Sequence, residues 1–462
     1  MLAELASAVR ERRVSATELV QLALARIQRD NPRLNAVVAL RAERALEEAR
    51  ALDRRVARGE DPGPLAGLPF LVKDMEDVAG MRTTYGSLLF AEAPAAVADG
   101  LVPRRLRAAG AIPIGKTNLP EFAFAGFTDN RLFGATRNPW NVEWSAGGSS
   151  GGSAAALAAG MVPIATATDG GGSIRIPSAL CGLAGLKPTN GVIGREPIPD
   201  WIDLSTFGPI ASTVADARLL LHIEAGPVTG DPTALPRPLE MRAELPSRAF
   251  AAHRFVDYGP VPEGVRSSFE SALARVERDL GLPLEPIEGG VIRSGDSGAD
   301  WLTMCAAEHV HHLGAELVRA NLDRFSEPFR ARMERGLAVG IDEYLAVRRR
   351  RFEYVRELDL LLGDDAVLLL PTLGYEGWRP DGVIPETGQE ARREGYSNTR
   401  ETNLTGHPSL SVPAGVSSNG LPFGLQIVGP RFRDDLVLNL GAAWEAANPW
   451  PAAAPGFEPF GV

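Results

Sequence analysis

The residues of this chain best suited to chemistry are two serines, each set among glycines. Ser149 lies within the glycine- and serine-rich segment 147–153, and Ser173 directly follows Gly170–Gly172. Glycine lets the backbone approach a ligand closely, so that its N–H groups can face developing negative charge. A serine beside such amides can attack a carbonyl carbon while the amides hold the resulting oxyanion. This pattern indicates acyl transfer.

Lys73 is the candidate base. It directly follows the apolar segment 69–72, which reads as a short strand, and it precedes Asp74. A lysine at the end of a strand is ordinarily a surface charge. A buried lysine loses its proton because desolvation disfavours the ammonium form, and it can then act as a general base. The presence of both serine runs favours the catalytic interpretation.

A second interpretation makes Ser149 the nucleophile. Segment 147–151 fits G-x-S-x-G, the nucleophile elbow of α/β-hydrolases, which requires a carboxylate and a histidine further along the chain. The histidines available are His309, His311, His312 and His407. This interpretation leaves the second glycine run unexplained, and the turn-forming segment 138–141 stands where the elbow expects a strand. A phosphate-binding loop is disfavoured because neither run has the lysine that it requires.

A metal site is disfavoured. The run Glu308-His309-Val310-His311-His312 lacks two histidines at i and i+4, the spacing that places two metal ligands on one helix face. We expect a solvated helix face there instead. Cys181 is expected to pack as a small buried hydrophobe. We therefore expect neither a metal ion nor an organic cofactor.

Composition points to an ordinary soluble protein. Apolar residues make up 45% of the 462 residues and charged residues 23%, with a net charge of −10. The acidic balance and the lack of a basic stripe argue against nucleic acid as a partner. Two cysteines cannot form a disulfide framework, and no secretory signal or membrane-spanning apolar run is present. We expect a cytoplasmic monomer or homodimer that does not bind membranes.

Strand and helix signals alternate along the chain, which favours an α/β fold in one large domain. The pair Ser15 and Glu18 forms a capping box. Helices are predicted at 19–27, ending at Asn31-Pro32, and at 41–58, 153–159, 262–281 and 300–362, the last with a solvated basic run at 348–351. Strands are predicted at 69–72, 111–114, 162–165, 367–372 and 410–413, and irregular surface at 226–262.

The two glycine-serine blocks resemble those of the amidase signature family. Similar family segments lie at 65–74, 115–118, 185–189, 208–211, 403–408 and 420–426, so the resemblance covers nearly the whole chain and is weakest over 226–360. The resemblance implies a Ser–Ser–Lys triad with Ser173 as nucleophile, Ser149 as a bridging serine on a cis peptide, and Lys73 as base. It further implies an oxyanion hole made by backbone N–H groups, with other side chains supporting the site. The hole would use Gly170, Gly171, Gly172 and Ser173, and the supporting residues would be Ser150, Asp169 and Arg175.

The fold implied by the resemblance is a single α/β domain, residues 1–462, with a central mixed β-sheet covered by helices on both faces. Its catalytic core would span about 60–225, its closing segment about 365–445, and a variable helical insert about 226–362. The chain departs from the family at Gly170, Ala146 and Ala167, and we expect the extra glycine at 170 to loosen the oxyanion loop or open room beside it. Candidate acyl-pocket residues are Phe122, Phe124, Phe127 and Phe133.

The function implied is hydrolysis of an amide bond through an acyl-enzyme. Aryl or alkyl amides are the expected substrates, with carbamates and esters as further possibilities. Two alternatives remain open: the glutaminase subunit of a tRNA-dependent amidotransferase, and a non-catalytic binding homologue. With Lys73 as base, we expect the acid limb of kcat/KM to lie above neutral pH, since lysine ordinarily titrates at about 10.4.

Overall fold

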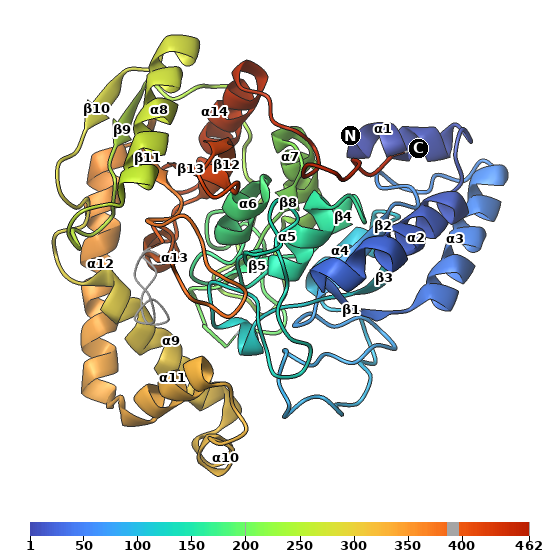
Figure 1. Ribbon diagram of the computed structural model, residues 1–462, viewed down its shortest axis with the longest axis horizontal. Helices are drawn as coiled ribbons and strands as arrows, with labels where there is room; N and C mark the ends of the chain where they lie inside the picture. The colour runs from blue at the N-terminus through green and yellow to red at the C-terminus, as the bar shows by residue number, and fades with distance from the viewer. Residues whose placement is uncertain (199, 386–396, 462) are drawn as a thin grey trace.

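The computed structural model describes residues 1–198, 200–385 and 397–461, and it shows a single α/β domain (Figure 1). A four-stranded and a seven-stranded sheet carry most of the strands. Both sheets are mixed, since each contains parallel and antiparallel pairs. The predicted fold class, a mixed α/β domain, is therefore confirmed.

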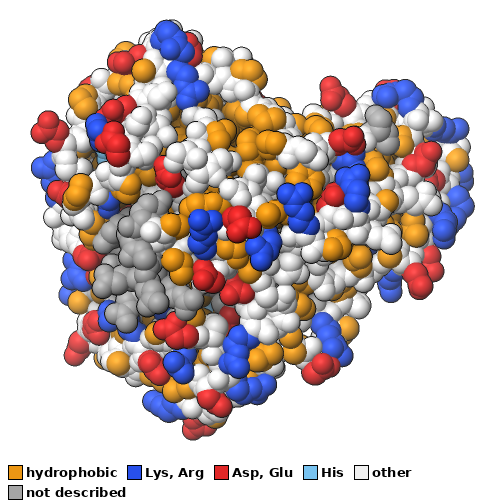
Figure 2. All heavy atoms as spheres, viewed as in Figure 1, with side chains coloured by type: hydrophobic (Ala, Val, Ile, Leu, Met, Phe, Trp, Pro, Cys, Tyr) orange, Lys and Arg blue, Asp and Glu red, His pale blue; other side chains and the backbone are white. Residues whose placement is uncertain are grey.

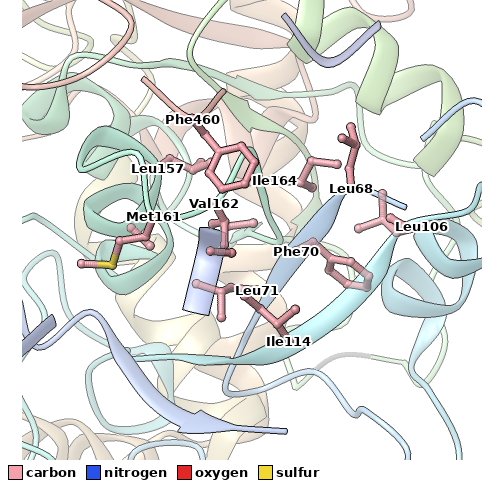
Figure 3. Close-up of a cluster of buried hydrophobic side chains, with 14 of the residues drawn as sticks. Leu68, Phe70, Leu71, Leu106, Ile114, Leu157, Met161, Val162, Ile164 and Phe460 are labelled. Carbon is pink, nitrogen blue, oxygen red and sulfur yellow. The ribbon is translucent and has the colours of Figure 1, made fainter. Parts of the chain in front are cut away.

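The four-stranded sheet holds the strand that ends in Lys73. Its order is β1 (Val37–Leu40), β3 (Ile112–Thr117), β2 (Pro69–Lys73) and β4 (Ile164–Ala165). The helices packed on this sheet are α2 (Ala16–Leu34), α3 (Ala42–Ala57), α4 (Leu101–Ala108) and α5 (Gly151–Ala158). Every residue of β2 is buried, as the apolar segment predicts, and Figure 3 shows Phe70 and Leu71 inside an apolar cluster. The lysine at the end of this strand is therefore carried into the interior.

The seven-stranded sheet lies beside it. Its order is β10 (Leu284–Pro286), β9 (Arg248–Ala251), β11 (Ala366–Pro371), β13 (Pro422–Val428), β12 (Ser409–Val416), β6 (Ala184–Lys187) and β8 (Ile210–Ala211). Alternate residues of a strand point to opposite faces. Val367 and Leu369 pack in the cluster of α8 (Glu263–Leu280) and α14 (Asp434–Ala447), whereas Leu368 and Leu370 pack in that of α12 (Ile341–Leu362). Helices thus cover both faces of this sheet.

The remaining elements complete the molecule. They are α1 (Leu2–Arg10), η1 (Glu121–Ala123), β5 (Thr168–Asp169), α6 (Arg175–Cys181), β7 (Thr206–Phe207), α7 (Val214–Glu224), α9 (Ser297–Leu313), α10 (Ala315–Ala320), α11 (Glu327–Ala338) and α13 (Arg400–Thr405). Strands β5 and β7 form a two-stranded sheet. No helix of the described residues is long and apolar enough to cross a membrane. On the face shown in Figure 2, acidic and basic side chains alternate and neither forms a continuous patch.

Several predicted boundaries are wrong. Helix α2 begins at the Ser15–Glu18 capping box as predicted but runs through Pro32 to Leu34, where Asn35 ends it in a left-handed conformation. The single long helix predicted at 300–362 is four helices, α9 to α12. Segment 226–362, predicted as irregular surface followed by helices, also contains strands β9 and β10. These short strands form one edge of the seven-stranded sheet, and the other strands of that sheet come from outside the segment.

The basic run at 348–351 is not simply solvated. Arg348 and Arg351 both bind Asp203, and Arg350 binds Asp300. These ion pairs join α12 to the 200–205 loop and to α9. The prediction of a solvated face is wrong because the acidic partners are remote in sequence.

Candidate active site

Three loops at element ends bring the predicted triad together. Lys73 ends β2, Ser149 stands just before α5, and Ser173 lies between β5 and α6. Ser149 and Ser173 line one cavity of about 30 Å³, called here the serine cavity, together with Thr168, Gly170, Trp201 and His309. Both serines are nine-tenths or more buried.

Lys73 is buried within a cage of hydroxyl groups. Its Nζ lies 2.7 Å from Ser149 Oγ, 3.0 Å from Ser150 Oγ and 2.8 Å from Thr168 Oγ1. Burial lowers the pKa of Lys73 to about 7, although the negative charges of Glu76 and Asp169 oppose this shift. The neutral amine is therefore accessible near neutral pH, lower than the sequence led us to expect.

The bridging position of Ser149 has the predicted backbone geometry, since the Gly148–Ser149 peptide is cis. The next residue, Ser150, links the two serine runs: its N–H donates to the Ser173 carbonyl at 3.3 Å, and its hydroxyl contacts Lys73. Ser149 therefore faces Lys73 on one side and the serine cavity on the other.

Asp169 and Arg175 brace the loop that carries Ser173. The Arg175 guanidinium donates to both Asp169 oxygens, at 2.8 and 2.9 Å, and both side chains are completely buried. Burial alone would raise the pKa of Asp169, but Arg175 and further donors lower it to about 2. Asn403 of α13 adds a contact to Asp169 at 3.0 Å. The pair holds the loop and does not face the serine cavity.

The same brace occupies one of the four proposed oxyanion donors. Gly172 N–H donates to Asp169 Oδ1 at 2.7 Å. The N–H groups of Gly170, Gly171 and Ser173 have no acceptor within the described part of the chain. These three amides, rather than all four, are available to an oxyanion in this structure.

Two tryptophans pack on the oxyanion loop. A Cβ at position 170 would lie 2.3 Å from Trp201 Cε3, and one at 171 would lie 2.4 Å from Trp301 Cζ2. Trp301 also donates its indole N–H to the Gly170 carbonyl at 2.7 Å. The expectation that Gly170 opens room beside the loop is wrong, because Trp201 fills the space that a side chain would take. That the glycine loosens the loop stays a prediction.

A second cavity adjoins Ser173 and is mainly aromatic. This aromatic cavity, of about 90 Å³, is lined by Phe124, Phe127, Trp201, Trp301, Trp378, Arg332 and Arg400, together with Gly171 and Ser173. Phe122 lines the serine cavity instead. Phe133 lines neither cavity, so three of the four predicted phenylalanines line a cavity that Ser173 also lines.

The histidines do not form a triad with Ser149. His407 is buried and faces Asp359 at 3.2 Å, and His312 faces Asp200 at 3.0 Å. His309 lines the serine cavity, but burial lowers its pKa to about 4 and it makes no hydrogen bond to either serine among the described residues. Ser149 is bonded to Lys73 instead, which contradicts the nucleophile-elbow interpretation.

The run 308–312 is only partly a solvated face. His311 and His312 are exposed as predicted, whereas Glu308 and His309 are buried. The Glu308 carboxylate accepts a hydrogen bond from the Tyr344 hydroxyl, whereas His312 faces a different carboxylate, that of Asp200. Cys181 is buried as predicted, and burial raises the pKa of its thiol.

Other site residues were not found from the sequence. Thr168 contacts Lys73, and Thr399 donates to the Gly171 carbonyl at 2.7 Å. Glu76 is a buried carboxyl whose pKa burial raises to about 7, and it accepts from Thr166. Thr168 stands next to Asp169 at the start of the second glycine run, so its position in the sequence could have indicated that it belongs to the site. The tryptophans, Thr399 and Glu76 carry no local signal, because only the fold brings them to the site.

Comparison with known proteins gives consistent relatives. The sequence profile of the Amidase family matches residues 18–438. An acylamidase of Rhodococcus erythropolis is 36% identical over 98% of this chain and 96% of its own length. A glutamyl-tRNA(Gln) amidotransferase subunit of Methylococcus capsulatus is 34% identical over 98% of both chains. The crystal structure of a bacterial aryl acylamidase superposes with a TM-score of 0.88 at 31% identity, covering 97% of this chain and 96% of that one.

Proposed function

Because this chain belongs to the amidase family and is a hydrolase of carbon–nitrogen bonds other than peptide bonds, we propose that it cleaves aryl or alkyl amides through an acyl-enzyme on Ser173. The observation that carries the proposal is the 2.7 Å contact between buried Lys73 Nζ and Ser149 Oγ, a serine that lines the same cavity as Ser173. Carbamates and esters pass through similar tetrahedral states and are proposed as further substrates.

The proposed first half-reaction uses the relay from Ser173 to Lys73. Ser173 Oγ bonds to the carbonyl carbon as its proton passes to Ser149 Oγ, whose own proton passes to neutral Lys73 Nζ. The protons then return along the same path to the amide nitrogen, the C–N bond breaks, and the amine leaves. Water attacks the resulting ester by the same relay, which releases the acid and restores Ser173.

The proposed oxyanion donors are the N–H groups of Gly170, Gly171 and Ser173. Donors fixed before the reaction stabilise the tetrahedral intermediate without reorganising, and losing one such donor typically reduces kcat about 100- to 1,000-fold. Trp301 and Thr399 bind the carbonyls of Gly170 and Gly171, which orients the neighbouring amides.

The aromatic cavity supports the choice of aryl or alkyl substrates. Its phenylalanine and tryptophan walls offer apolar area to a ring or short chain beside Ser173. The similarity to an acylamidase and to an aryl acylamidase points in the same direction.

The glutaminase component of an amidotransferase is the second candidate function, favoured by the 34% identity to a glutamyl-tRNA(Gln) amidotransferase subunit. That function would require partner proteins, whereas hydrolysis of simple amides requires none. Purification from the native cell, followed by assays with glutamine and with anilides, separates the two. Ammonia release from glutamine together with a copurifying partner protein would replace our proposal.

The direct test is covalent labelling with a fluorophosphonate. We expect mass spectrometry to place the adduct on Ser173, and Ser173→Ala to lose both labelling and anilide hydrolysis. Ser418→Ala, at a serine outside the site, is the control and should retain both. An adduct on Ser149 would overturn the assigned nucleophile. No labelling and no hydrolysis in the wild type would instead indicate a non-catalytic homologue.

A further inference from the structure

Two arginines line the aromatic cavity beside the nucleophile. Arg332 projects from α11, and Arg400 is the first residue of α13. The Arg332 guanidinium lies over the Phe124 ring, 4.3 Å from its centroid, and that of Arg400 lies over Trp301 at 5.2 Å. Each cation is therefore held against an aromatic wall of the cavity that contains Ser173.

Neither arginine has an anionic partner among the described residues. Within the part of the chain that the structure describes, the buried Nη1 of Arg332 makes no hydrogen bond, and neither side chain forms an ion pair. Burial lowers the pKa of Arg332 to about 10, and the positive charge of Arg400 adds to this shift. Glu401 and Asp296 interact electrostatically with Arg400 from outside the cavity lining, but neither pairs with it.

Burying a cation without a partner is unfavourable, and two neighbouring cations repel each other as well. Arg332 and Arg400 are only partly exposed, whereas two buried arginines have strong partners: Arg175 pairs with Asp169, and Arg26 donates to three carbonyls. Arg332, by contrast, lies in the wall of the cavity that the nucleophile shares. A ligand that supplies the missing anion removes this penalty.

We propose that the substrate carries a carboxylate that binds Arg332 and Arg400 in the aromatic cavity while its amide carbonyl lies at Ser173. The guanidinium group presents N–H donors in a planar fork that matches a carboxylate, and the aromatic walls accept the ring or chain between the carboxylate and the amide. The inference rests on the proposed function, since it names the substrate class of the same site.

The test compares pairs of anilides that have the same shape and differ in charge. Succinanilate and 4-methylpentananilide differ by a carboxylate or an isopropyl group on the acyl side of the amide. 4-Acetamidobenzoate and 4′-isopropylacetanilide differ in the same way on the amine side. We expect wild type to prefer the anionic member of at least one pair by about tenfold or more in kcat/KM, the scale of one charge-assisted contact.

Arg332→Gln should remove that preference by lowering kcat/KM for the anionic member much more than for the neutral member. Arg400→Gln should reduce the preference in the same direction. Arg330→Gln, at an exposed arginine of the same helix, is the matched control and should keep the wild-type preference.

Two outcomes overturn the inference: wild type that does not discriminate within either pair, or Arg332→Gln that lowers both members of a pair equally. In both cases neutral anilides are still hydrolysed, so the proposed amidase function survives. Loss of all anilide hydrolysis in the wild type would instead contradict the proposed function itself. Circular dichroism of each variant identifies a failure to fold.

Discussion

At the scale of single residues, the hydroxyl cage around Lys73 explains how a lysine can serve as a base. Among the described residues, the Lys73 amine has three hydrogen-bonding partners, all neutral hydroxyls, so no carboxylate there contacts it directly to fix the charged form. Burial then decides the protonation state. Ser150 and Thr168 hold the nitrogen in place, and Ser149 is the partner that links it to Ser173, the proposed nucleophile.

Removing Ser149 tests whether the relay has two steps. Ser149→Ala should fold normally and lose about three orders of magnitude or more in kcat, because both proton transfers pass through this hydroxyl. Single-turnover kinetics with an anilide measure the loss, and thermal unfolding checks the fold. Activity close to wild type would mean that Lys73 takes the proton of Ser173 directly.

The pH dependence of kcat/KM follows from the pKa of Lys73. Lys73 must be neutral to accept a proton, so activity should rise with pH through about pH 7 and fall tenfold per unit below it. Lys73→Ala should remove this limb together with most of the rate. A pH–rate profile of kcat/KM on a neutral anilide measures this acid limb. If replacing His309 removed the limb, the lysine mechanism would be contradicted.

Glu76 should set the position of that limb. Its negative charge raises the pKa of Lys73, so Glu76→Gln should move the limb to lower pH, and the two groups titrate as a coupled pair in the wild type. Glu92→Gln, whose side chain is 86% exposed, should leave the profile unchanged. A limb unmoved in Glu76→Gln would show that this carboxyl does not act on Lys73.

At the scale of elements, the loop between β5 and α6 is shaped by segments remote from it. Trp301 comes from α9, Thr399 from the residue before α13, and Asn403 from α13 itself. Asp169 and Arg175 brace the loop from within its own segment. The loop that carries Ser173, the proposed nucleophile, therefore depends on the helices packed around it.

The close packing of Gly170 against Trp201 predicts a coupled pair of substitutions. Gly170→Ala should lower kcat/KM about 100-fold, because a Cβ there collides with the indole ring and displaces the oxyanion donors. The double variant with Trp201→Ala should recover part of the loss, giving a non-additive double-mutant cycle. Gly340→Ala, which has open space for a Cβ, is the control. Additive losses would mean that the collision does not cause the defect.

At the scale of the whole molecule, the core around β2 positions the lysine. Phe70 is fully buried in the cluster of Figure 3, beside Leu71 and Ile114. Phe70→Ala should destabilise the protein by about 3–5 kcal/mol, since such a cavity is not refilled. Phe352→Ala, at a residue 74% exposed, should change stability by no more than about 0.5 kcal/mol. Chemical denaturation measures both, and equal effects would contradict the assigned core.

The sequence predicts the local part of this structure well. Strand β2, helix α5 and the two serine loops follow from apolar runs, small residues and glycines that stand next to one another. The edge strands β9 and β10 and the division of 300–362 into four helices do not follow from it, because short strands and helix breaks depend on tertiary packing. The same reason applies to Trp201, Arg332 and Arg400: nothing in their own segments shows that they reach Ser173.

The distribution of the two cavities along the chain has a consequence for how this protein can change. The proposed triad comes from residues 73–173, whereas half of the residues that line the aromatic cavity come from 201–400. Libraries restricted to Arg332, Trp378 and Arg400 would alter which molecules enter without replacing a residue of the proposed proton path or a tryptophan packed on the oxyanion loop. Selectivity can therefore change at these positions while one proposed proton path serves a succession of diverging substrates.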